Sequence, residues 1–281
     1  MDGVSQRWPS PAKINLFLHI TGRRADGMHE LQTAFQFIDL CDEMSFTVLP
    51  SPDVKRATDL PGVKYEEDLS VRAAKLLQNE ADIRQGVEIN LKKIIPMGGG
   101  LGGASSNAAT TLLALNKLWQ VHYNIEDLAA LGEQLGADVP VFVHGRSAWA
   151  EGIGEQLTPI EMPECWYLVA NSRIHVNTRE MFADSQLTRN CPTLTICPPE
   201  PGVLGNVFEP IVRARYSAID QVFDWLADYA TPFLTGTGGC VLASFADQDA
   251  ALSVQAKAPA GIDVFVVKSQ NVSPVLDRVS I

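Results

Sequence analysis

Apolar and polar residues alternate along the segment "AKINLFLHI", from Ala12 to Ile20. Sustained alternation with a period of two predicts a β-strand that turns one face to a core and the other to polar surroundings. We therefore expect a half-buried strand here. Its apolar face consists of Ile14, Leu16, Leu18 and Ile20, and its second face of Lys13, Asn15, Phe17 and His19.

Apolar residues recur at helical spacing in later parts of the chain. The predicted helices lie within residues 66–81, 108–119, 124–137 (ending near Gly136), 205–229 (with an interruption allowed for at Pro210) and 247–258. Further strands are predicted at residues 43–49, 86–95, 147–152, 166–171, 239–245 and 262–269, and a loop at residues 189–205. Helices and strands mix without a regular βαβ cycle, which favours an α+β fold.

The region around residue 157 is rich in glycine and proline, which is typical of a domain boundary. We expect an N-terminal domain at 1–157 and a C-terminal domain at 158–281. The last few residues have room to pack back on the N-terminal domain.

Composition and charge exclude several classes of protein. The chain has 281 residues, 46% hydrophobic and 20% charged, as in a globular protein with a sizeable core. Its 33 acidic and 22 basic residues give a formal net charge of −11, which argues against a nucleic-acid or membrane-surface binder. The five cysteines have no C-x-x-C spacing and the five histidines form no H-E-x-x-H motif. We expect reduced thiols in the cytoplasm and no protein-built metal cage.

A glycine cluster directly precedes one of the predicted helices. Five of the six positions from Gly98 to Gly103 are glycine. Glycine allows positive φ and brings N–H groups close to an anion, and the positive end of the following helix points to the same place. We predict an anion-binding loop, although a plain strand-to-helix turn would also use glycines. Ser105 and Ser106 could cap the helix, and one of their hydroxyls could reach a bound Mg²⁺.

Two familiar phosphate-binding templates fail on this loop. Its glycines satisfy G-x-G-x-x-G, but Glu126 and Asp127 fall within a predicted helix, where a dinucleotide-binding fold needs an acidic residue at a strand end. The G-x-x-x-x-G-K-[ST] template fails because Ala104 occupies the position of the lysine. The loop must therefore find positive charge elsewhere.

Lys13 and Asp138 are candidates for the missing chemistry. Lys13 shares the polar face of the first predicted strand with Asn15, about 6.6 Å further along; alternatively it is a solvated surface lysine. Asp138 is either a functional acid or the N-cap of a helix that begins near Pro140. Phosphoryl transfer to a hydroxyl needs an acid that accepts or orients the proton, and positive charge on the transferred group. The two residues would supply one of each.

A second glycine cluster lies in "LTGTGGCVLA", before a predicted strand. Gly236, Gly238 and Gly239 form either a tight turn or a second backbone wall around a phosphate. Together with "PAKINLFLHI" and "PMGGGLGGASSNAA", this segment resembles the three signature motifs of the GHMP kinase superfamily, in the family's order and spacing.

The resemblance covers nearly the whole chain. "ITGRRADGMHELQTAF", "GADVPVFVHGRSAWAEG" and "GNVFEP" are similar to the branch of the superfamily that acts on 4-diphosphocytidyl-2-C-methyl-D-erythritol. It implies a ribosomal-protein-S5-domain-2-like ATP-binding domain, a C-terminal ferredoxin-like domain and an active site between them. The implied reaction transfers the γ-phosphate of ATP, with Mg²⁺, to the 2-hydroxyl of that substrate, in non-mevalonate isoprenoid precursor biosynthesis.

The resemblance also assigns roles to individual residues. Asp138 matches the catalytic base and Lys13 its electrostatic partner, while His29 matches the residue that reads the cytosine edge and Phe182 the residue that packs on the cytosine ring. The positions that match ATP-binding residues are Asp68, Pro96, Met97, Gly98, Gly99, Gly100, Leu101, Gly102, Gly103, Ala104, Ser105 and Ser106. The positions that match substrate-binding residues are Asn15, Met28, His29, Thr178, Phe182, Gly238 and Gly239.

Two residues depart from the family pattern. Met28 stands where the family usually has a tyrosine that stacks on the cytosine, so we expect aromatic stacking from one side only. Asp68 stands where an asparagine is common near the adenine. A carboxylate can accept a hydrogen bond but cannot donate one, so the adenine contact must differ there.

Two other functions are compatible with the motifs. One is a GHMP kinase for another small alcohol, such as homoserine or mevalonate, against which the segment around His29 argues. The other is a non-catalytic nucleotide-binding relative, against which the presence of both Lys13 and Asp138 argues. We expect ATP and a small-molecule substrate as partners, no nucleic acid or membrane, and a monomer or weak homodimer.

Overall fold

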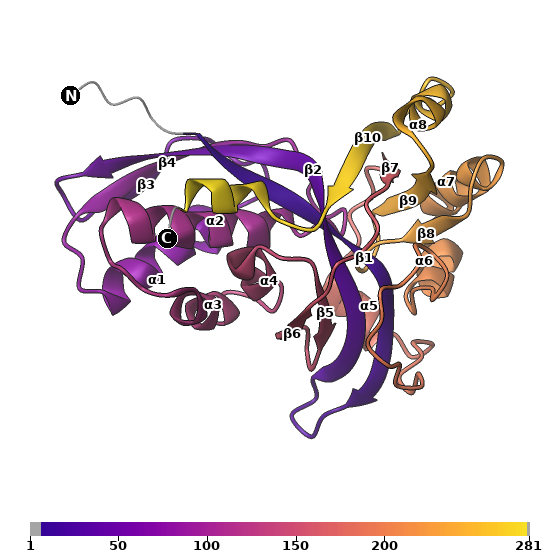
Figure 1. Cartoon of the computed structure of the whole chain (residues 1–281), viewed down its shortest axis with the longest axis horizontal. Helices are drawn as coiled ribbons and strands as arrows, with labels where there is room; N and C mark the ends of the chain where they lie inside the picture. Colours follow the sequence, from indigo (N-terminus) through magenta and orange to yellow (C-terminus); the bar gives the residue numbers. More distant parts are fainter. Residues whose placement is uncertain (1–6, 280–281) are drawn as a thin grey trace.

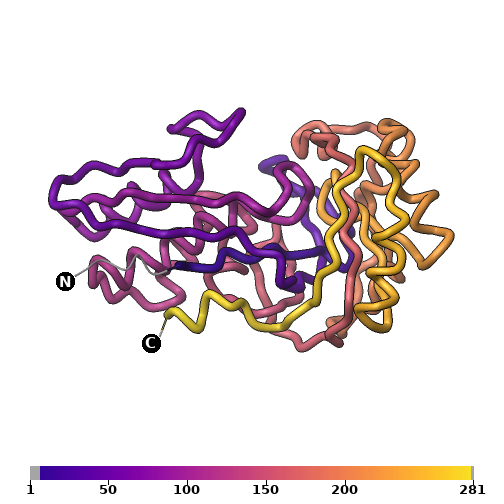
Figure 2. The backbone as a smooth tube through the Cα atoms, turned by 90° about the horizontal axis from the view of Figure 1, so that it is seen from above, coloured from indigo at the N-terminus to yellow at the C-terminus, as the bar shows by residue number. Residues whose placement is uncertain are grey.

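Two long antiparallel strands run through the middle of the structure and connect its two ends (Figure 1). They are β1 (Trp8–Arg23) and β2 (His29–Leu49) of a computed structural model that describes residues 7–279. The elements of the first half of the chain lie at one end of this pair and those of the second half at the other, as Figure 2 shows from above.

The remaining elements follow the chain in two groups. The first group consists of β3 (Val54–Arg56), the 3₁₀ helix η1 (Tyr65–Glu67), α1 (Leu69–Glu80), β4 (Gly86–Lys92), α2 (Gly103–Leu118), α3 (Ile125–Glu133), α4 (Val139–His144), β5 (Ala148–Glu151) and β6 (Gln156–Pro159). The second group consists of β7 (Trp166–Asn171), α5 (Thr178–Ala183), α6 (Glu209–Arg215), α7 (Ser217–Ala227), β8 (Pro232–Leu234), β9 (Cys240–Phe245), α8 (Gln248–Gln255) and β10 (Asp263–Gln270). The 3₁₀ helix η2 (Pro274–Arg278) follows the second group and returns to the first.

The strands form one continuous path in the order β3-β4-β2-β10-β7-β9-β8, with β1 and β5 also paired to β2. Strands β3 and β4 pair in parallel, whereas each neighbouring pair in the series β10, β7, β9, β8 is antiparallel. Their spatial order, with helices between β7 and β8 and between β9 and β10, is the ferredoxin-like arrangement. The predicted α+β class is confirmed. No helix within residues 7–279 combines the length and apolarity that a membrane span requires.

Three hydrophobic clusters hold these elements together. The first lies between the strands of the first group and helices α1 to α4, and it includes Val275 of η2. The second lies between the strands of the second group and their helices. The third contains Phe17 of β1, Trp149 of β5 and Tyr167 of β7, so it joins the two groups. Residues from both halves of the chain are thereby packed into a common core.

The first strand differs from its prediction, because both of its faces are buried. Lys13, Asn15 and Phe17 are 3%, 2% and 1% exposed. The strand passes between cores: Leu18 belongs to the second cluster and Phe17 to the third. A register shift between Asn15 and Leu18 also interrupts the regular alternation of faces. Periodicity shows which residues share a face, but not how many other elements pack on that face.

Two predicted helices also have different limits. The helical region at 205–229 breaks at Tyr216 rather than at Pro210, because Pro210 lies in the first turn of α6, where a missing N–H costs no hydrogen bond. Helix α3 ends at Glu133, before the expected end near Gly136. Helix α4 was anticipated only as an alternative, through Asp138 as the N-cap of a helix near Pro140, whereas the short helix α5 and the part of β2 before residue 43 were not anticipated.

Phe17→Ala should destabilise the protein by about 3–5 kcal/mol, because it removes a ring that packs on Trp149 with centroids 4.9 Å apart, at the junction of the two groups. Urea unfolding, compared at constant m-value, measures the change. Val203→Ala is the control: Val203 is 67% exposed, so its loss should change stability by less than about 0.5 kcal/mol. A similar small change for Phe17→Ala would contradict a shared core.

Candidate active site

The main cleft, of about 690 Å³, is lined by residues from both halves of the chain. Most of the predicted site residues border it. They are Lys13, Asn15, Asp68, Pro96, Met97, Gly98, Gly99, Gly100, Leu101, Gly102, Gly103, Ala104, Ser105, Asp138, Thr178 and Phe182. Ser106, Met28, His29, Gly238 and Gly239 are not among the lining residues.

The loop between β4 and α2 has a backbone that requires glycine. Gly98, Gly100 and Gly102 have φ of 72°, 78° and 70°, in the left-handed region. A Cβ on Gly100 would also lie 2.4 Å from the carbonyl oxygen of Thr235, so the two glycine-rich segments pack backbone to backbone. Gly102 is the N-cap of α2 and no side chain caps that helix, which leaves its first N–H groups free to bind an anion.

The two serines after the loop have different surroundings, and neither caps the helix as expected. Ser106 is buried, and its hydroxyl lies 2.8 Å from that of Ser10. Ser105 borders the cleft instead. Of the two hydroxyls, only that of Ser105 is placed to meet a ligand or an ion there.

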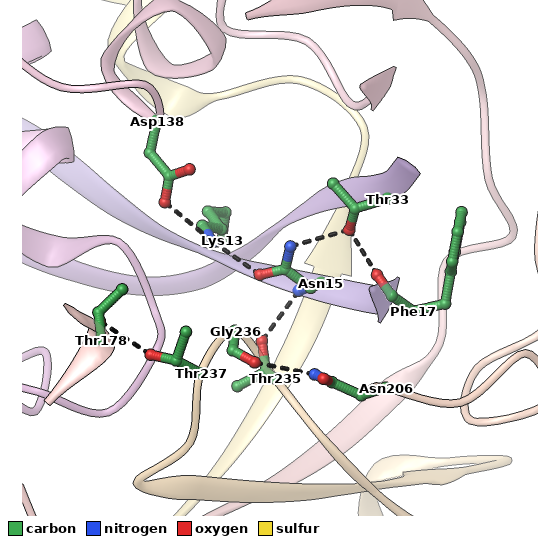
Figure 3. A network of polar contacts seen from close by, with 10 residues as sticks. All are labelled: Lys13, Asn15, Phe17, Thr33, Asp138, Thr178, Asn206, Thr235, Gly236 and Thr237. Carbon is green, nitrogen blue, oxygen red and sulfur yellow. Dashed lines mark hydrogen bonds and ion pairs between the residues drawn. The ribbon is translucent and has the colours of Figure 1, made fainter. Parts of the chain in front are cut away.

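Lys13 carries a buried positive charge into the cleft (Figure 3). Its Nζ lies 2.7 Å from Oδ1 of Asn15 and 3.1 Å from Oδ2 of Asp138, and 4.8 Å from the centre of the Phe35 ring. Its backbone N–H donates to the carbonyl oxygen of Leu101 at 3.0 Å, which ties β1 to the glycine loop. Lys13 is therefore not the solvated surface lysine of the alternative interpretation.

Asp138 stands at the N-cap position of α4, but its carboxylate makes no capping hydrogen bond. The carboxylate instead faces Lys13 and is 36% exposed. Half of the alternative interpretation is thus right, since a helix does begin here with Pro140 in its first turn. The acid itself remains available to a ligand in the cleft.

Lys93 is a second cation in the cleft, and the sequence analysis missed it. A Cβ on Gly103 would lie 2.7 Å from its Nζ, so the ammonium group adjoins the start of α2. Burial lowers the pKa of Lys93, while Asp42, whose carboxylate is 2.5 Å away, opposes that change. The only sequence signal was its position in "KKIIPMGGG", just before the loop. Lys13 and Lys93 are thus the two lysines that border the cleft beside the glycine loop.

Asp42 holds the segment that leads into the glycine loop. Its buried carboxylate accepts hydrogen bonds from the backbone N–H groups of Ile94 and Ile95 and from the side chain of Asn107. Together with the ammonium of Lys93, these donors give both carboxylate oxygens of Asp42 a partner. The Asp42 charge, which is 0% exposed, is therefore fully paired. The loop is therefore anchored at both its strand end and its helix end.

The second glycine cluster reaches the cleft through Gly236 and Thr237 rather than through Gly238 and Gly239. Gly238 packs near Val176, and a Cβ on Gly239 would lie 2.5 Å from the carbonyl oxygen of Gly98. These two glycines therefore pack against neighbouring residues and the glycine loop rather than lining the cleft. The Thr237 hydroxyl lies 2.9 Å from the hydroxyl of Thr178, at the start of α5 (Figure 3).

Asn15 is held by side chains from distant parts of the chain. Its Nδ2 donates to the hydroxyl of Thr33 at 2.8 Å, and its backbone N–H donates to that of Thr235 at 2.9 Å (Figure 3). The Thr33 hydroxyl in turn donates to the carbonyl oxygen of Phe17. Because its carbonyl oxygen contacts Lys13, the orientation of the Asn15 amide is determined by its partners.

An aromatic pair from the two halves of the chain adjoins the cleft. Phe182 of α5 borders the cleft, and the His29 ring packs on it with centroids 5.2 Å apart. Met28, in the turn between β1 and β2, is 48% exposed and lies outside the cleft lining. The expected contact of Met28 with a pyrimidine stays a prediction.

Asp68 borders the cleft near α1, but its carboxylate already has partners. It caps α1 by accepting from the Ser70 N–H at 2.8 Å, and it pairs with Arg56 at 3.3 Å. The substitution of an acid at this position is thus matched by a neighbouring cation.

The cleft thus combines a glycine loop, the two lysines Lys13 and Lys93, and the carboxylate of Asp138. Residues 68–146 match the family model "GHMP kinases N terminal domain". A crystal structure of 4-(cytidine 5'-diphospho)-2C-methyl-D-erythritol kinase superposes with a TM-score of 0.80 at 30% identity, covering 94% of this chain and 99% of that one.

Curated relatives agree over nearly the full length. The 4-diphosphocytidyl-2-C-methyl-D-erythritol kinase of Nitrosococcus oceani is 50% identical over 270 residues, which is 96% of each chain. That of Shewanella denitrificans is 48% identical over 278 residues, covering 99% of this chain and 98% of its own. The predicted membership is thereby confirmed, and the homoserine- and mevalonate-type alternatives are not supported. The chain belongs to the 4-diphosphocytidyl-2-C-methyl-D-erythritol kinase family of the GHMP kinase superfamily.

Proposed function

We propose that the cleft transfers the γ-phosphate of ATP to the 2-hydroxyl of 4-diphosphocytidyl-2-C-methyl-D-erythritol, with Asp138 as the base and Lys13 as its electrostatic partner. Family membership supports the reaction. The observation that supports the two roles is the contact of a buried ammonium with an available carboxylate, beside the glycine loop.

The residues divide the reaction between them. The substrate oxygen forms a bond to the γ-phosphorus as the bond to the β-phosphate oxygen breaks, and ADP leaves with that electron pair. Asp138 accepts the proton of the hydroxyl, while Lys13 stabilises charge on the transferred group. The N–H groups at the start of α2 and the ammonium of Lys93 balance the charge of the remaining phosphates.

The pair formed by Phe182 and His29 suits the cytosine. We assign Phe182 to the face of the base and His29 to its edge, with Met28 on the opposite face, and Asn15, Thr178 and the second glycine cluster to the rest of the substrate. The Phe182 ring is suited to this role because it packs edge-on against the Phe208 ring, with centroids 4.9 Å apart, which gives it a defined orientation.

Mg²⁺ fits the site as an ion that ATP brings with it. Within residues 7–279 no group of three or more His, Cys, Asp or Glu residues could hold a metal. Mg²⁺ commonly binds through substrate phosphates and one or two protein oxygens, and the Ser105 hydroxyl is such an oxygen at the glycine loop. When bound, the ion would neutralise phosphate charge.

The organisation of the molecule is also a proposal. We divide it near residue 157 into an ATP-side domain and a substrate-side domain. Strand β6, which ends at Pro159, is the last element before the substrate-side domain. The five cysteines are free thiols, which supports a cytoplasmic location. A monomer or weak homodimer remains our expectation.

Asp138→Asn should lower kcat by about 10² or more while leaving ATP affinity and stability nearly unchanged, because a positioned base contributes about 10²–10⁴ in rate. An ADP-release assay with the cytidine substrate, beside nucleotide titration and urea unfolding, measures the three quantities. The matched control is Asp249→Asn, an exposed acid in the first turn of α8, which should turn over like the wild type. A normal kcat for Asp138→Asn would rule out its role as base.

Lys13→Met should also lower kcat by about 10²–10³, since it removes an electrostatic contact made at the reacting group. Methionine keeps the length of the stem, and Asp138 stays solvated, so stability should change by no more than about 1 kcal/mol. Lys92→Met is the control, because Lys92 is a strand lysine, 68% exposed, whose ion pair with Glu43 lies outside the cleft. If both variants keep wild-type turnover, Lys13 is a structural lysine only.

A further inference from the structure

Arg189 makes a contact that determines the chemical form of His29. Its Nε–H donates to Nε2 of His29 at 3.0 Å, across 160 positions of sequence. Its other nitrogens donate to the carbonyl oxygens of Leu187, Phe182 and Asp184, at 3.1, 2.9 and 2.7 Å. The guanidinium is therefore held by the backbone around α5 and presents Nε–H to the His29 ring in a fixed direction.

A guanidinium has only donors, so its partner atom on the imidazole must be an acceptor. Nε2 of His29 therefore carries no proton, and the proton of the neutral ring lies on Nδ1. Free histidine in water favours the other tautomer, with the proton on Nε2. Within residues 7–279 Nδ1 of His29 makes no hydrogen bond to the protein, and it is not among the buried polar atoms without a partner, so this N–H is accessible from outside the protein.

The charges around the ring favour the same form. Those that face it are Arg189, on the segment after α5, and Arg23, at the end of β1, while its packing neighbour Phe182 is uncharged. Partial burial, then Arg189, then Arg23 lower the pKa of His29, so that the imidazolium is disfavoured. The surroundings thus favour the neutral ring, in which Nδ1–H is the donor.

We propose that Arg189 is a specificity-determining positioning residue that fixes His29 as the Nδ1–H tautomer, and that this donor selects cytosine over uracil at the ring nitrogen N3. The inference rests on the proposed function, in which His29 meets the edge of the base packed on Phe182. Cytosine N3 is an acceptor and pairs with Nδ1–H. Uracil carries a proton on N3, so the two donors would face each other without a hydrogen bond.

The tautomer can be observed without turnover. In protein with ¹⁵N-labelled histidine, two-bond ¹H–¹⁵N spectra distinguish Nδ1–H from Nε2–H, and His29→Ala identifies the His29 signals among the five histidines. The wild type should show Nδ1–H and a ring that stays neutral below pH 6.5. Arg189→Met should shift the ring towards Nε2–H and raise its pKa. An Nε2–H tautomer in the wild type would overturn the proposal, even if Arg189→Met fails to fold.

Base discrimination gives the functional test. We compare kcat/KM for the cytidine substrate and for its uridine analogue, so that any effect of a substitution on ATP binding cancels in the ratio. The wild type should prefer cytidine by about tenfold or more at every pH between 8 and 5.5. Arg189→Met should lose the preference at pH 8, because the freed ring can accept from uracil N3–H. It should regain the preference near pH 5.5, where the imidazolium donates from both nitrogens.

Arg215→Met separates this role from a structural one. Arg215 pairs with the Asp184 carboxylate and so anchors the same segment without touching His29. It should keep the wild-type ratio at every pH, and Arg189→Met should add nothing in a His29→Ala background. If His29→Ala loses the preference but Arg189→Met keeps it, the tautomer proposal is wrong while the His29 assignment stands. If His29→Ala also keeps it, the assignment of His29 is wrong, whereas turnover of the cytidine substrate by the wild type still tests the kinase function.

Discussion

A buried ammonium group must have partners, and the placement of Lys13 shows how many elements that requirement engages. Moving a charge out of water costs several kcal/mol unless it is paired and hydrogen-bonded. The partners of Lys13 come from its own strand (Asn15), from the neighbouring strand β2 (Phe35) and from the start of α4 (Asp138). The β1–β2 pair, α4 and the glycine loop are thus held in one relative position, at the proposed reaction centre.

Close backbone approach is the second constraint, and it explains both glycine clusters. Around Gly100 and Gly239 the two loops lie so near each other that a Cβ on either would come within 2.5 Å of a carbonyl oxygen in the other. Side chains there would separate the two halves of the cleft. Glycine therefore serves two purposes in this protein, since it exposes N–H groups to an anion and lets two loops from distant parts of the sequence form one wall.

Polar groups in this cleft are positioned by hydrogen-bond partners, and two of these partners, Asp42 and Asn206, lie outside the cleft lining. Asp42 holds the entrance to the glycine loop, Asn206 donates to the backbone of the second cluster, and Thr33 orients Asn15. Each of these contacts satisfies a group that burial would otherwise leave unpaired. The same requirement favours one orientation of the Asn15 side chain, because an alternative orientation would lose a hydrogen bond.

Much of this could be read from local pattern. The alternation in β1, the helical spacing before Trp119 and the glycines after Met97 are properties of neighbouring residues, and the structure has a strand, a helix and left-handed turns there. The motif order also indicated the superfamily, and Lys13, Asp138 and Ser105 do border the cleft. Short-range pattern is informative at these positions because backbone conformation and capping depend on residues a few places apart.

Other features depend on contacts between residues far apart in the chain. The polar face of β1 is buried because a second set of strands packs on it. Lys93 reaches the glycine loop because its ion pair with Asp42 orients it. The two glycine-rich loops cross in such a way that Gly236 and Thr237, rather than Gly238 and Gly239, border the cleft. The bond from Arg189 to His29 joins residues 160 positions apart. Periodicity and motifs carry no information on such pairs, because burial and hydrogen-bond partners depend on which surfaces meet when the chain folds.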